Sequence, residues 1–143
     1  MPPIDEWSVF RGAHPNALLV GSEASAKAAI SRHLPFLRPP VVHWHPRAVA
    51  EPTLPASGTL VIWDVDTMGL MQQEQLLMWM DSLAADVQVI SVGGSPVFPL
   101  VLREEFLDTL YYRLNIVCLT LASNRAAAFG ANSTVKACNA HVT

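Results

Sequence analysis

Short apolar runs alternate with segments of helical periodicity along most of the chain. The apolar runs predict strands, and we expect these at 17–20, 41–44, 59–65, 87–92 and 115–121. Helices are expected between the strands, at 24–34, 70–83 and 102–113. This β-α-β-α order predicts an α/β domain built in three layers around a mainly parallel sheet.

The composition is that of a folded domain. The chain has 143 residues, of which 51% are hydrophobic and 15% charged, enough to form one core. A net charge of −3 provides no basic field for nucleic acid. No apolar run approaches the roughly 20 residues that span a bilayer, and the acidic start lacks a secretory segment. We therefore expect a cytoplasmic protein without direct contact to nucleic acid or membrane.

The pattern changes after Leu121, where small and polar residues dominate. We expect one domain at 1–121 and a poorly packed tail at 122–143. Cys118 and Cys138 have no metal or redox spacing. Cys118 lies within an apolar run, which predicts a reduced thiol in the core.

Residues 106–119 carry a specific resemblance to a known family. Phe106 and the run LYYRLNIVCL at 110–119 resemble the segment FREDLYYRLNVVPL of the AAA+ domain in sigma-54-dependent transcription activators. The family uses this segment at a subunit boundary, where an Arg reaches a neighbour's nucleotide site. That role falls on Arg113, and the family's other Arg falls on Leu107. The resemblance covers residues 15–121 and implies contact through 106–119 with a second copy or an AAA+ relative. The alternative for Arg113 is an ordinary surface residue.

The resemblance implies a P-loop-like fold with a phosphate-binding loop between the first strand and helix. The eight matching residues are Gly21, Ser22, Glu23, Ala24, Ser25, Ala26, Lys27 and Ala28. Gly21 and Lys27 keep the spacing of GxxxxGKS/T. Ala26 replaces the second glycine, and Ala28 replaces the hydroxyl that holds Mg²⁺. We expect ATP to bind weakly if it binds, without Mg²⁺. The alternative is a turn glycine and a solvated helical lysine.

The family's GTLFLDE strand aligns with residues 58–64. Trp63 replaces the Asp that positions Mg²⁺, and Asp64 stands where the family has its catalytic Glu. The alternative is that Asp64 and Asp66 cap the next turn or helix. Gly93 and Gly94 stand where the family reads the γ-phosphate with polar side chains. We expect Gly21 and Asp64 at the same carboxyl edge of the sheet.

Two weaker patterns occur elsewhere. His43 and His45 form an HxH pair that could hold zinc with help from Asp64, although our main expectation is a protein without a bound metal. The helix at 70–83 matches the family at Leu70, Gln73, Leu76 and Leu77, which predicts core positions. It is also more apolar than one buried face requires, so a partner groove remains an alternative.

These features predict a regulatory AAA+-like domain linked to transcription rather than a competent ATPase. The family's GAFTGA loop, which touches sigma-54, has no counterpart at 45–57. The helical lid that comes after the family's last strand is also expected to be absent. Two alternatives remain: an ATP-hydrolysing sigma-54 activator domain, and a gene remnant without function.

Overall fold

The computed structural model describes residues 14–51, 54–83, 87–121 and 136–137. Six strands form one sheet in the order β2-β3-β4-β1-β5-β6. Their bounds are β1 (Ala17–Val20), β2 (Val41–Trp44), β3 (Gly58–Ile62), β4 (Val87–Gly93), β5 (Val117–Thr120) and β6 (Lys136–Ala137). Strands β1 to β5 run parallel, and β6 pairs antiparallel with β5.

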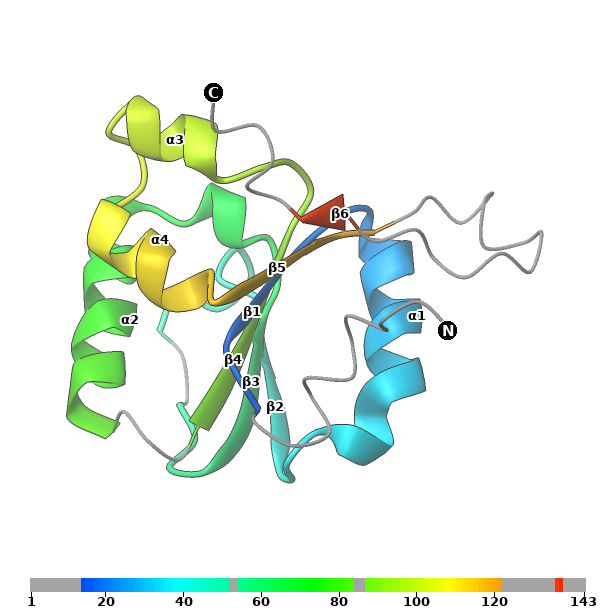
Figure 1. Cartoon of the computed structure of the whole chain (residues 1–143). Helices are drawn as coiled ribbons and strands as arrows, with labels where there is room; N and C mark the ends of the chain where they lie inside the picture. Colours follow the sequence, from blue (N-terminus) through cyan, green and yellow to red (C-terminus); the bar gives the residue numbers. More distant parts are fainter. Residues whose placement is uncertain (1–13, 52–53, 84–86, 122–135, 138–143) are drawn as a thin grey trace.

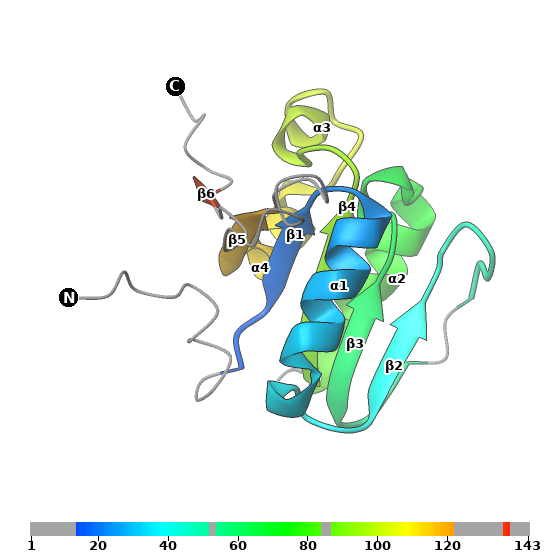
Figure 2. The same ribbon diagram turned by 90° about the vertical axis from the view of Figure 1, so that its right-hand side faces the viewer.

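Helices cover both faces of the sheet (Figures 1 and 2). Their bounds are α1 (Glu23–His33), α2 (Leu70–Leu83), α3 (Phe98–Leu102) and α4 (Asp108–Leu114), with short 3₁₀ helices η2 (Leu34–Phe36) and η3 (Val65–Thr67). Helix α1 lies on one face, and α2 and α4 lie on the other. The predicted three-layer α/β fold with a mainly parallel sheet is confirmed.

Alternate residues of each strand supply two separate cores, as period-two side-chain direction requires. In β1, Ala17 and Leu19 pack with Ile30 of α1. Leu18 and Val20 belong to the other core, together with residues of α2 and α4. Because both faces are covered, β1 and β3 are buried at every position rather than alternating, which explains their continuous apolar runs in the sequence.

Gly58 opens β3 in a conformation that other residues rarely adopt, with φ of 96°. A Cβ atom at this position would lie 2.3 Å from the carbonyl oxygen of Pro40. The next residue, Thr59, donates its N–H to that same oxygen at 2.9 Å. The start of β3 is therefore held close to the residues that lead into β2, and only glycine fits there.

Three predicted boundaries are wrong. Strand β5 begins at Val117 rather than at residue 115, because Asn115 is the C-cap of α4. Strand β3 ends at Ile62 rather than at residue 65, because Asp64 turns left-handed (φ 55°) and η3 comes next. The helix expected at 102–113 is two helices. Glu104 is left-handed (φ 59°) between them, and the N–H of Leu107 bonds to the side chain of Gln73 at 2.8 Å instead of continuing a helix.

The predicted core positions of α2 are only partly correct. Gln73 and Leu76 are fully buried, and Leu77 packs partly buried against the core. Leu70 is 47% exposed, so its assignment to the core is wrong. It is the first residue of the helix. The predicted reduced thiol is also wrong, since Cys118 is disulfide-bonded.

The predicted tail at 122–143 lies outside the described residues except for β6. Among the residues that the structure describes, no helix is long and apolar enough to cross a membrane.

Candidate functional site

The β1–α1 connection is short and tightly held. Gly21 comes directly after β1 and donates its N–H to the carbonyl of Gly93 at 3.0 Å. A Cβ atom on Gly21 would lie 2.9 Å from that of Leu121. Ser22 is the N-cap of α1, and its hydroxyl oxygen accepts the N–H of Ser25 at 3.0 Å. This capping bond stabilises a helix that begins at the next residue, Glu23.

Most of the segment that the sequence assigned to phosphate binding is therefore helical. Helix α1 begins at Glu23, so 23–28 lie within it. The N–H groups of Ser25 and Ala26 are bonded to Ser22. A phosphate-cradling loop needs such N–H groups free to point at the anion. The chain after Ser22 therefore forms the first turn of a helix instead of a phosphate-binding loop.

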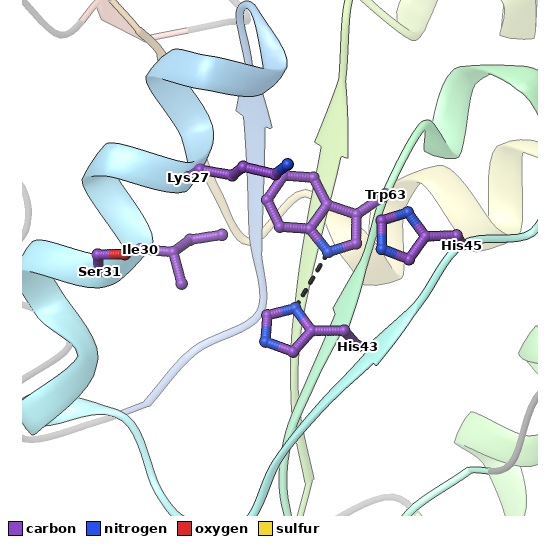
Figure 3. Close-up of a pocket in the computed structure, with 6 residues that line it drawn as sticks. All are labelled: Lys27, Ile30, Ser31, His43, His45 and Trp63. Atoms are coloured by element: carbon purple, nitrogen blue, oxygen red, sulfur yellow. Dashed lines mark hydrogen bonds between the residues drawn. The ribbon is translucent and has the colours of Figure 1, made fainter.

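Lys27 lies on the second turn of α1 rather than in a loop. Its ammonium group pairs with the carboxylate of Glu23 at 3.3 Å, and both side chains are more than half exposed. Figure 3 shows its side chain extended toward the indole of Trp63.

Gly21 and Asp64 lie at the same carboxyl edge of the sheet, as predicted. Gly21 comes directly after β1, Asp64 comes two residues after β3, and both strands run parallel to β4 between them. The carbonyl of Asp64 accepts bonds from the N–H and the hydroxyl of Thr67 at 2.9 and 2.7 Å. Asp64 thus closes the turn into η3 through its backbone.

Asp66 is the acid that faces the end of β4. Its Oδ2 accepts the hydroxyl of Ser95 at 3.1 Å. Its Oδ1 is buried without a hydrogen-bond partner, and it lies 3.5 Å from where a Cβ of Gly93 would stand. Asp66 therefore lies beside Gly93, whose carbonyl accepts the N–H of Gly21.

Trp63 packs on the α1 face of the sheet. It is 3% exposed and belongs to the core that includes Ile30 and Leu37. Its Nε1 donates to Nδ1 of His43 at 3.1 Å. The rings of His43 and His45 lie nearly parallel to the indole, at interplanar angles of 16° and 8°.

This arrangement disfavours the zinc alternative. Indole Nε1 can only donate, so Nδ1 of His43 must carry the lone pair and a neutral ring has its proton on Nε2. Neither nitrogen is then available to a metal while the bond lasts. Within the described part of the chain, no three His, Cys, Asp or Glu side chains gather into a metal-binding group.

A pocket of about 260 Å³ opens beside these rings. It lies between α1 and the ends of β2 and β3 (Figure 3). The lining residues are Lys27, Ile30, Ser31, His43, His45 and Trp63. Ile30 and Ser31 were not singled out from the sequence, although they stand at the i+3 and i+4 positions from Lys27, on one helix face.

Arg113 lies at the opposite edge of the sheet from Gly21. It is in the last turn of α4, and its carbonyl accepts the side-chain amide of Asn16, the residue before β1. Its guanidinium pairs with Asp81 of α2 and donates to the carbonyl of Met80 at 3.4 Å. The structure thus separates Arg113 from the other predicted site residues.

Known structures share this fold at low sequence identity. NtrX from Brucella abortus in complex with ADP superposes with a TM-score of 0.64 at 16% identity, over 80% of this chain and 33% of that one. The P-loop NTPase domain of a sigma-54 transport activator from E. coli gives 0.57 at 16% identity, over 80% of this chain and 96% of that one. The chain has the fold of a sigma-54 activator NTPase domain.

The likeness to these proteins is one of fold. The chain spans about a third of the length of NtrX and nearly all of the E. coli NTPase domain. The sequence itself matches no family model and no curated protein. Two NtrX structures are complexes with ADP or ATP, and that property belongs to NtrX.

Proposed function

We propose that this domain is a regulatory relative of sigma-54 activator NTPase domains that binds ATP weakly or not at all and does not hydrolyse it. The observation that carries the proposal is the start of α1 at Glu23, directly after the Ser22 cap. Without a loop of free N–H groups, the phosphates lose the cradle on which P-loop affinity rests.

The positions around that cradle support the same proposal. Ala28 offers no hydroxyl to Mg²⁺, and Trp63 replaces the acid that would position the metal. Gly93 and Gly94 supply no polar side chain at the end of β4. Phosphoryl transfer is accelerated mainly by electrostatic stabilisation of the transition state by such groups. Without them, we expect no appreciable hydrolysis.

Any residual nucleotide affinity would rest on one side chain. The buried, unpartnered carboxylate oxygen of Asp66 beside Gly93 repels a phosphate when no cation lies between them. Lys27 is the one cation among residues 21–28, so any such affinity depends mainly on its ammonium group.

Calorimetric titration with ATP, with and without Mg²⁺, tests the binding proposal. We expect weak binding or none, little effect of Mg²⁺, and loss of any signal in Lys27→Ala but not in Arg32→Ala, a cation on the same helix. Phosphate release should stay far below about 1 s⁻¹, the lower end of typical enzyme turnover. Tight Mg²⁺-dependent binding, or turnover at that rate abolished by Lys27→Ala, would favour the ATP-hydrolysing activator instead.

The regulatory role requires a protein contact, and we place it at residues 106–119. Tyr112 and Ile116 in this segment are 61% and 62% exposed, so both side chains are accessible to a partner. The partner is a second copy or an AAA+ relative in the bacterial cytoplasm. A chain that neither self-associates nor binds such a relative would leave the gene-remnant alternative as the better explanation.

A further inference from the structure

We propose that the pocket between α1 and the ends of β2 and β3 binds a small organic anion that carries a flat ring, such as an aromatic carboxylate. This site shares Lys27 with the segment 21–28, but its other lining residues lie outside that segment, and the proposal does not depend on nucleotide binding. Its volume of about 260 Å³ is close to the lower end of small-molecule sites, roughly 300 Å³.

The lining selects an anion. None of the six lining residues is acidic, and Lys27 contributes an ammonium group. Its pairing with Glu23 is between exposed side chains, and such pairs contribute little free energy. The ammonium group can therefore exchange Glu23 for a ligand carboxylate at small cost.

His43 adds a donor whose direction is fixed. Because Nδ1 accepts the indole N–H of Trp63 at 3.1 Å, the proton of the neutral ring must be on Nε2. Ser31 contributes a hydroxyl from α1. Lys27, His43 and Ser31 thus offer three donors to one cavity, which suits the two oxygens of a carboxylate.

The aromatic wall selects a flat molecule. The ring of His45 lies within 8° of the plane of Trp63, with centroids 5.7 Å apart, and that of His43 within 16° at 6.0 Å. Trp63 is buried, whereas His43 and His45 are exposed, so a planar ligand in the same orientation gains offset stacking mainly with the two imidazole rings. Ile30 supplies an apolar floor on the side of α1.

The position in the fold agrees with the proposal. His45 comes directly after β2 and Trp63 directly after β3, so the pocket lies at the carboxyl ends of two parallel strands. The pocket thus shares the carboxyl edge of the sheet, where ligands of open α/β folds bind at the switch point, which here lies between β1 and β4. The pocket adjoins the outer strands rather than the β1–β4 pair that contacts Gly21.

Titration of the full chain with benzoate, monitored by NMR, tests the proposal. Benzyl alcohol keeps the ring without the charge, and acetate keeps the charge without the ring. We expect benzoate to bind saturably near the ~1 mM range typical of fragment-sized ligands, and both controls to bind at least about tenfold more weakly.

Variants locate the binding. Lys27→Ala should weaken benzoate by about tenfold or more, since a charge-assisted hydrogen bond is lost. Ser31→Ala and His45→Ala should weaken it less, and Arg32→Ala, an exposed cation outside the lining, should leave it unchanged. Ser31 and His45 lie outside residues 21–28, so their variants separate this site from any nucleotide site. Three results would overturn the proposal: benzoate binding that does not saturate, benzyl alcohol that binds as tightly as benzoate, or a loss of benzoate affinity in Arg32→Ala equal to that in Lys27→Ala.

Discussion

The indole Nε1 of Trp63 donates a hydrogen bond of 3.1 Å to Nδ1 of His43, and this bond joins the carboxyl ends of β3 and β2. Trp63 is buried, whereas His43 lies on an edge strand with an exposed ring. The protonation state of a surface histidine is therefore tied to the packing of a core tryptophan. Protonated His43 has no lone pair on Nδ1, so it cannot accept this bond.

The stability of the fold should depend on pH through His43. Partial burial lowers the pKa of His43 below 6.5, and the nearby His45 lowers it further. The unfolded chain then binds more protons just below pH 6.5, so the stabilisation present above 6.5 is lost as pH falls. We expect the free energy of urea unfolding to decrease from about pH 7 to about pH 5. His43→Gln, which keeps an acceptor but does not titrate, should flatten this decrease, and an unchanged slope would contradict the assignment.

Gln73 should be among the most sensitive positions in α2. Its amide donates to the carbonyls of Met68 at 2.9 Å and Glu105 at 3.0 Å, and its oxygen accepts the N–H of Leu107. Gln73→Leu leaves these backbone groups buried without partners, which costs roughly 1–3 kcal/mol for each group. We expect the unfolding free energy to fall by about 3 kcal/mol or more. Gln75→Leu, the same change on the exposed face, serves as the control and should have little effect.

Gly58 should not tolerate a side chain. Its φ of 96° is unfavourable for alanine, and the added Cβ would overlap the carbonyl oxygen of Pro40. We expect Gly58→Ala to lower stability by more than about 1 kcal/mol. Gly94→Ala provides the comparison, because a Cβ there has no atom within 4 Å. Equal thermal midpoints for the two variants would show that the β3 entry is not constrained as described.

The sheet could be predicted from the sequence because its strands are buried on both faces. Residues 17–20 and 59–62 are apolar at every position or nearly so. Such a run can be recognised as a buried strand without knowing which elements pack against it. The break between α3 and α4 could not be predicted, since it depends on Gln73, which lies more than thirty residues away from Leu107. Such long-range hydrogen bonds override local helix propensity.

The candidate site was less accessible to sequence reasoning than the fold. The spacing of Gly21 and Lys27 suggested a phosphate loop, but it does not determine where a helix begins. The apolar pattern already predicts a helix from residue 24, and the hydroxyl of Ser22 caps α1 so that it begins at Glu23; the family resemblance predicts a loop over the same residues. Residues of α1 and of two strands line the pocket. From the sequence alone, one could predict only that Lys27 and Ser31 lie on the same face of a helix.

The pairing of Arg113 with Asp81 gives a direct test of the subunit-contact proposal. An Arg113 that reaches a neighbour must first leave Asp81, and pairs between exposed side chains contribute only about 0–1 kcal/mol. Asp81→Asn should therefore change folding stability by less than about 1 kcal/mol while releasing the guanidinium. If residues 106–119 form an interface, Asp81→Asn should maintain or strengthen association, and Arg113→Ala should weaken it.

Sedimentation velocity over a range of concentrations, alone and with an AAA+ relative, measures this association. Arg103→Ala is the matched control, because Arg103 is also exposed and paired, with Glu105 at 2.6 Å, but lies outside 106–119. Loss of association in both arginine variants would indicate a general charge effect. If Arg113→Ala leaves association unchanged, Arg113 does not take part in the interface. Its guanidinium would then contact only α2.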